Sequence, residues 1–192
     1  MKPTSRRRRD DDGLVVLEFA MIAPVLIMVL FGITEYGMAF RDKAHLTSAV
    51  RAGVRVGASD RNTRLADYDV LQAVRAATSG MTVEYVVVYK ANSDVTGAMP
   101  VSCRTMTSQA GLCNVYTGAQ MASLTTANFQ NGSCTGEPDV SWCPTSRAID
   151  LAAGRDYLGV FVQARRTFMS GEIPGGGVTF SEFAVMQLEP GG

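Results

Sequence analysis

The sequence predicts an α+β protein in which a long N-terminal transmembrane helix continues as an amphipathic helix and packs on a small antiparallel sheet of about three strands. An apolar stretch of helix-forming length begins directly after a charged leader, and helical periodicity continues beyond it. Segments dense in β-branched and aromatic residues follow at 81–89, 157–166 and 180–189. About 65 residues, rich in Ser, Thr, Gly and Asn, separate the first of these strands from the second.

These observations divide the chain into four parts. They are a basic leader at 1–13, a transmembrane helix at 14–36, a helical extension with a second helix at 37–80, and a β-rich domain at 81–192 with a cysteine loop at 100–145.

The leader concentrates positive charge at one end of a chain whose formal net charge is zero. Five of the 18 basic residues lie in the first nine positions, and three aspartates, residues 10–12, follow them. A basic segment before an apolar one stays on the cytoplasmic side of a membrane, so the rest of the chain is expected outside the cytoplasm. The overall charge gives no reason to expect a nucleic-acid partner.

The segment LVVLEFAMIAPVLIMVLFGI, residues 14–33, contains one ionisable residue, Glu18. About 20 helical residues span the hydrocarbon core of a bilayer, which is about 30 Å thick. A core helix apolar on every face is uncommon in a domain this small. A cleaved signal peptide fits poorly, because the stretch is too long and no small-x-small cleavage signal closes it. We therefore expect a single-pass membrane protein.

Helical character continues after the span to about Ala58. Leu46, Val50, Gly53 and Gly57 fall on one stripe of this helix, which predicts an amphipathic extension. The two glycines, four residues apart, either let another element approach closely or loosen the packing, and the sequence leaves both readings open. A second, short helix is expected at about 65–77, ended by a serine and a glycine.

Four cysteines, all in the β-rich domain, form an even and clustered set: Cys103, Cys113, Cys134 and Cys143. In an exported domain such a set predicts two disulfides, each worth about 2–4 kcal/mol. The sequence spacings of 10, 21 and 9 favour sequential pairing among the three connectivities possible. Zinc is the alternative, but no CxxC pair is present and the only histidine, His45, lies on the distant helix.

Motifs of common enzymes are missing from the sequence, which contains no GxSxG, P-loop or HExxH. The glycine run at 175–177 lacks the context of a phosphate-binding loop and predicts a turn between the last two strands. We therefore expect no enzymatic activity, no cofactor, no metal and no small-molecule substrate. The unusual residue is Glu18, because a carboxylate at mid-membrane costs about 2.5 kcal/mol or more; it either has a function or reaches to the headgroups.

The order Gly13, Leu14 and then Glu18 at the fifth position of the apolar segment resembles the processing site of type IV prepilins. That resemblance implies a prepilin peptidase that cuts after Gly13, and a Glu18 that pairs with the N-terminal amine of a neighbouring subunit during assembly. The acidic triplet at 10–12 departs from the basic or neutral residues that many prepilins carry there.

The longer string is similar to the TadE-like family of tight-adherence (Tad) pilus systems. The matching features are Glu18-Phe19-Ala20, Pro24, Phe31-Gly32, Glu35-Tyr36-Gly37 and Ala52-Gly53-Val54-Arg55. The resemblance implies a pseudopilin or minor pilin with Glu18 and Phe19 as assembly residues. It also implies membrane lipid, a prepilin peptidase, other pilins or pseudopilins and the Tad assembly machinery as partners. The alternative is a membrane-anchored extracytoplasmic binding domain with no pilus role; an enzyme ranks far below both.

Overall fold

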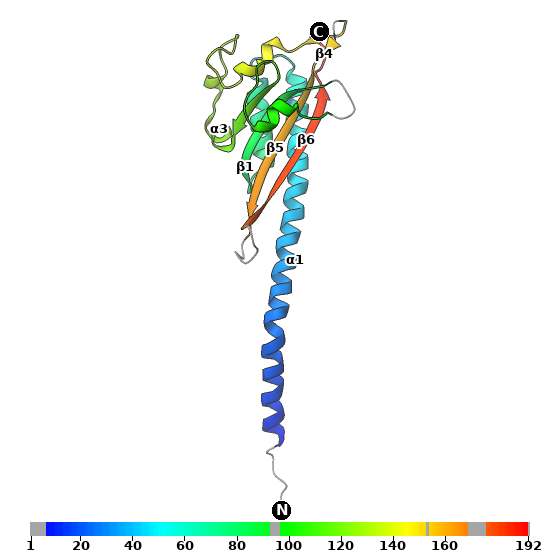
Figure 1. Ribbon diagram of the computed structural model, residues 1–192, viewed down its shortest axis with the longest axis vertical. Coiled ribbons are helices and arrows are strands. Elements are labelled where there is room, and N and C mark those ends of the chain that lie inside the picture. Colours follow the sequence, from blue (N-terminus) through cyan, green and yellow to red (C-terminus); the bar gives the residue numbers. More distant parts are fainter. Residues whose placement is uncertain (1–6, 93–96, 153, 169–175, 192) are drawn as a thin grey trace, which may run out of the picture.

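The structure is a computed structural model that describes residues 7–92, 97–152, 154–168 and 176–191. Its dominant element is α1, Arg7–Asp60, a helix of 54 residues and therefore about 80 Å long. Figure 1 shows the N-terminal part of α1 projecting far from the folded domain, which gathers around its C-terminal part. The helix is continuous across Pro24, and the long helix predicted from the sequence is confirmed.

The start of α1 differs from the prediction. The sequence indicates a helix beginning after Gly13, whereas α1 begins at Arg7 and runs through Gly13 without a break. An existing helix gains one backbone hydrogen bond for each residue added, and a glycine inside it costs only about 1 kcal/mol relative to alanine. The leader residues 1–6 lie outside the described residues.

A four-stranded antiparallel sheet packs against the C-terminal part of α1. Its strands, in spatial order, are β2 (Cys113–Thr117), β1 (Thr82–Ala91), β5 (Tyr157–Thr167) and β6 (Gly177–Gln187). The α+β prediction is confirmed, with four strands in place of about three. The additional strand, β2, lies inside the cysteine loop, where the sequence analysis placed no strand.

Shorter elements make up the rest of the secondary structure in the described residues. They are helix α2 (Ala66–Ala77), helix α3 (Gly118–Ser123), the 3₁₀ turns at Val101–Thr105, Thr126–Asn128, Val140–Trp142 and Pro144–Ser146, and a two-stranded sheet of β3 (Ile149–Asp150) and β4 (Gly154–Arg155). Of the glycine run between β5 and β6, Gly175 lies outside the described residues, and Gly176 has a φ of 63° and accepts a hydrogen bond from Phe168.

The main core lies between the sheet and the two helices. It is formed by aliphatic residues of α1 and α2 and by the facing side chains of β1 and β5: Leu46, Val50, Val54, Val70, Leu71, Val74, Val86, Val88, Leu158, Val160 and Val162. On the opposite face of β1, a smaller cluster forms around Val87 and Tyr89, covered by the segment from Met99 to Cys113. Alternate residues of β1 therefore pack into two different clusters, because successive side chains of a strand point to opposite faces of the sheet.

The two helix glycines are close-approach positions. A Cβ at Gly57 would lie 2.4 Å from Cδ2 of Leu158 and 2.7 Å from Cγ2 of Val70. A Cβ at Gly53 would lie 2.9 Å from Cγ2 of Val74. Between the two readings that the sequence left open, the structure selects close packing: α2 and β5 approach α1 where it has no side chain.

Candidate membrane and assembly site

The N-terminal part of α1 has an apolar surface that the folded domain leaves uncovered. Between Gly13 and Asp60 the helix is long and apolar enough to cross a membrane, and its most apolar 18-residue window has no buried residue. The exposed apolar side chains are Leu14, Val15, Val16, Leu17, Phe19, Met21, Ile22, Val25, Leu26, Ile27, Met28, Val29, Leu30, Phe31 and Ile33. A continuous surface of this kind marks a membrane or protein contact, and it fits a single-pass membrane anchor.

The predicted processing and assembly residues all lie on this uncovered segment. Apart from its chain neighbours and the backbone of its own helix, nothing lies within 4 Å of the position that a Cβ at Gly13 would take. Leu14 is 65% exposed, Phe19 is 66% exposed, and Glu18 is exposed as well. Residues 14 and 18 are one helical turn apart and therefore share one face, with a rise of about 6 Å between them. No part of the folded domain that the structure describes lies near this turn, so none of its side chains pairs with the Glu18 carboxylate.

The junction between the uncovered and the packed part of α1 contains buried charge that the sequence analysis missed. Glu35 and Asp42, seven residues apart on α1, are 2% and 4% exposed. Asp42 forms an ion pair with Arg166 of β5, whose guanidinium also contacts the sulfur of Met38 at 3.0 Å. The signal available in the sequence was two acids on one helix face at a spacing of two turns, with an arginine pair at 165–166 in a strand.

The cysteine loop is closed by two disulfides, Cys103–Cys113 and Cys134–Cys143. This is the sequential pairing that the spacings favour. With all four cysteines in disulfides, none is free to bind zinc. Within the described residues there is also no group of three or more His, Cys, Asp or Glu side chains that could hold a metal ion.

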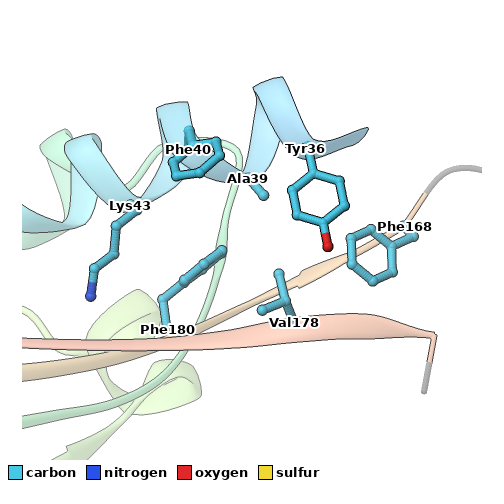
Figure 2. A pocket seen from close by; sticks show the side chains of 7 residues that line it. All are labelled: Tyr36, Ala39, Phe40, Lys43, Phe168, Val178 and Phe180. Atoms are coloured by element: carbon cyan, nitrogen blue, oxygen red, sulfur yellow. The ribbon is translucent and has the colours of Figure 1, made fainter. Parts of the chain in front are cut away.

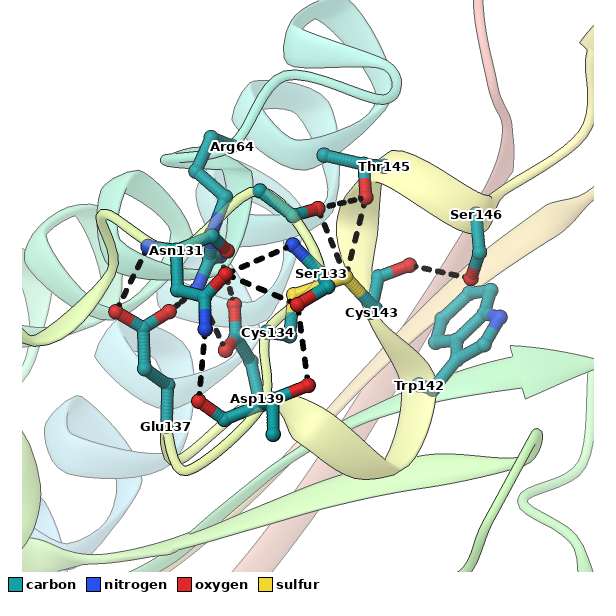
Figure 3. Close-up of a disulfide and its surroundings, with 12 residues drawn as sticks. Arg64, Asn131, Ser133, Cys134, Glu137, Asp139, Trp142, Cys143, Thr145 and Ser146 are labelled. Atoms are coloured by element: carbon teal, nitrogen blue, oxygen red, sulfur yellow. Dashed lines mark hydrogen bonds and ion pairs between the residues drawn. A yellow bond between two sulfur atoms is a disulfide. The ribbon is translucent and has the colours of Figure 1, made fainter.

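Charged contacts attach the second disulfide loop to the helices. In Figure 3, Arg64 reaches Glu137 and Asp139 next to the Cys134–Cys143 disulfide. Burial raises the pKa of Asp139 above its usual range, although Arg64 partly opposes this. For Glu137 burial acts in the same direction but is outweighed, because hydrogen bonds from Asn131 and Arg64 lower its pKa. The loop is therefore held at the N-terminal side of α2 by one arginine.

A second polar centre is fully enclosed beside the first. Asp67 of α2 accepts hydrogen bonds from the Asn114 amide at 2.8 Å and from the Tyr116 hydroxyl at 2.7 Å, and it forms an ion pair with Arg147. The guanidinium of Arg147 lies 4.2 Å from the ring centroid of Trp142. Burial, and then the charge of Asp67, raise the pKa of Tyr116. This centre joins α2, β2 and the end of the cysteine loop.

A pair of carboxyl groups lies where α1 ends. Asp60 and Asp69 of α2 lie close enough for their charges to interact. Burial raises the pKa of Asp60, and the nearby charge of Asp69 raises it further. Burial also raises the pKa of Asp69. Both carboxyl groups are therefore easier to protonate in the folded chain than in the unfolded chain.

Comparison with known proteins supports the reading of α1. The model of the family described as TadE-like protein matches residues 13–55, which begin at the predicted processing glycine and end within the packed part of α1. No curated protein and no solved structure matches the chain. The resemblance to the TadE-like family is thus confirmed, and it rests on the match of residues 13–55 to that family, which is associated with Tad pili.

Proposed function

We propose that this chain is a pseudopilin or minor pilin that takes part in the assembly of Tad pili. Residues 14–36 hold it in the cytoplasmic membrane, a prepilin peptidase cuts after Gly13, and the domain that follows folds outside the cytoplasm. The two disulfides support an oxidising compartment for that domain. The protein acts through helix packing and not as an enzyme.

The observation that carries the proposal is a single carboxylate, Glu18, within an apolar helical surface that the domain leaves uncovered. A charge in that position is unfavourable in lipid, and leaving it unpaired in a helix bundle is costly too. Cleavage after Gly13 creates an α-amino group at Leu14. That amine on a neighbouring subunit neutralises Glu18, so cleavage supplies the partner that this carboxylate needs.

The test is pilus assembly by cells that carry Glu18 variants of the full-length chain. Glu18→Ala and the nearly isosteric Glu18→Gln are both expected to abolish the assembly contribution, because neither carries the negative charge that neutralises the α-amino group. Glu18→Asp retains the charge with one methylene less and is expected to preserve part of it. If the alanine variant is expressed, processed and supports pili as well as wild type, the proposed role of Glu18 is wrong.

Processing and topology are tested by the intact mass of the protein purified from its own membranes. A mass that starts at Leu14, with four thiols blocked only after reduction, is expected. A start at Met1, with activity that survives replacement of residues 14–36 by an unrelated span, would favour an anchored extracytoplasmic binding domain instead.

A further inference from the structure

An apolar groove lies where the uncovered part of α1 meets the sheet. Figure 2 shows side chains of α1 above those of the β5–β6 end of the sheet. The groove between them has a volume of about 340 Å³. The groove is lined by Tyr36, Ala39, Phe40, Lys43, Phe168, Val178 and Phe180. Its volume lies within the range of about 300–1,000 Å³ that is typical of small-molecule sites.

The lining is suited to an apolar ligand. The ammonium group of Lys43 forms an ion pair with Glu182 and donates to the carbonyl oxygen of Ser181 at 3.2 Å, so its charge is already neutralised and its alkyl stem faces the groove. Tyr36 and Phe40 are 68% and 73% exposed although they border this space. The hydroxyl of Tyr36 points toward the strands in Figure 2. This hydroxyl is a polar group at one end of a groove whose remaining surface is apolar.

The height of the groove along α1 indicates what occupies it. If the hydrocarbon core begins near Leu14, about 20 residues bring its far boundary to Ile33. Tyr36 then lies about 5 Å and Phe40 about 10 Å beyond that boundary, in and just above the headgroup layer, which is about 5–7 Å thick. Aromatic side chains favour this depth. The groove thus adjoins the apolar surface of the span and lies at the depth of the headgroup layer.

We infer that this groove binds an acyl chain of a phospholipid from the leaflet next to the folded domain. The lipid docks the β5–β6 end of the sheet onto the membrane and fixes the domain relative to the span. The inference rests on the membrane insertion included in the proposed function. A water-soluble ligand is disfavoured because no uncompensated charge lines the described groove.

The experiment uses the full-length chain in phosphatidylcholine vesicles that contain phosphatidylcholine with a photoactivatable diazirine on one acyl chain. After irradiation, adducts are located by tandem mass spectrometry. Adducts are expected at Val178 and Phe180 in addition to the span. Phe183 is the internal control, because it is 49% exposed on the same strand but faces the other side of the sheet. Labelling of Phe180 is expected to exceed that of Phe183 at least fivefold.

A matched pair of variants tests the groove itself. Ala39→Phe fills it and is expected to reduce the strand adducts at least fivefold, while Ala44→Phe, at an exposed position of the same helix, leaves them unchanged. Span adducts serve as the reference in both. The urea midpoint of each variant shows whether it is folded. If a variant does not fold, the adduct pattern of the wild-type chain still tests the inference.

Several outcomes overturn the inference. Adducts confined to residues 14–33 in a protein that resists carbonate extraction reject the groove but leave membrane insertion intact. Equal labelling of Phe180 and Phe183 indicates unspecific contact. If a photoreactive amino acid placed at position 180 yields crosslinked dimers, the groove binds a second copy of the chain and not a lipid. A protein that carbonate extracts and that no lipid labels contradicts the insertion on which the proposed function depends.

Discussion

Replacing Asp67 by asparagine is expected to destabilise the folded domain severely while leaving its shape unchanged. The side chains of Asp67 and Arg147 are both fully buried, and Arg147 forms no second ion pair within the described residues. The asparagine amide has nearly the shape of the carboxylate and still accepts the hydrogen bond of Tyr116. What the variant removes is the negative charge that compensates Arg147.

The magnitude follows from the burial of the pair. Removing one partner of a buried ion pair costs about 3–5 kcal/mol, because the other charge stays buried without compensation. What remains for Arg147 is the carbonyl oxygen of Trp142 at 3.2 Å and the face of its ring. Domains of this size are stable by about 5–15 kcal/mol, so the variant loses a large fraction of the total. With a urea dependence of about 2 kcal/mol/M, the midpoint falls by roughly 2 M.

The assay is urea unfolding of the full-length chain in detergent micelles, followed by tryptophan fluorescence. Trp142 is the only tryptophan, is 4% exposed and lies against Arg147, so its emission reports on this centre. Arg147→Met and the double variant complete a cycle. The double variant is expected to be no less stable than the worse single variant, since neither charge is then left alone. Additive losses, or a midpoint shift under 0.5 M for Asp67→Asn, would refute this reasoning.

Further predictions use the same unfolding measurement. Gly57→Ala is expected to cost about 1–2 kcal/mol, since overpacking outweighs the gain in helix propensity, whereas Gly37→Ala, in open space on the same helix, is expected to cost nothing. Replacing both Cys103 and Cys113 by serine is expected to cost about 3 kcal/mol from the entropy of the opened loop; an unchanged midpoint would contradict it. The protonated form of Asp60 stabilises the fold fully below the unfolded pKa of about 3.9, and this contribution is lost as the pH rises through the raised folded pKa. Asp60→Asn should therefore raise stability at pH 7 and flatten this part of the pH profile; a profile unchanged by the variant would argue against the raised pKa of Asp60.

The elements predictable from the sequence are those whose burial is periodic over many residues. The stripe containing Leu46 and Val50 is buried against the sheet, and β1 is dense in valine, with side chains on both faces in apolar clusters. Such patterns can be interpreted without knowing the partner element, because the residue types on each face of a helix or strand indicate whether that face is buried. The close approach at Gly57 was different: the glycine was visible in the sequence, but Leu158, which lies a hundred residues later, was needed to choose between two readings.

What sequence reasoning missed depends on pairs of residues far apart in the chain. Strand β2 has five residues within a polar loop and is a strand because it pairs with β1 and because Cys113 at its start is tied to Cys103. Asp67 and Arg147 are 80 residues apart and look like ordinary surface charges in a sequence. A charged side chain is buried only when the fold encloses it together with its partner, and no local sequence pattern predicts that pairing.

The continuity of α1 links the two ends of the proposed mechanism. Glu18 and Asp42 are 24 residues apart on one unbroken helix, which places them about 36 Å apart along its axis. Asp42 is fixed to β5 through Arg166, so the domain cannot rotate about α1 without breaking a largely buried ion pair. A contact that fixes the orientation of the helix at Glu18 therefore also fixes the direction in which the sheet and the cysteine loop face. If assembly selects that orientation, Arg166→Met should impair pilus assembly in chains that are still folded, processed and membrane-inserted, and normal assembly by such chains would show that the domain orients independently of α1.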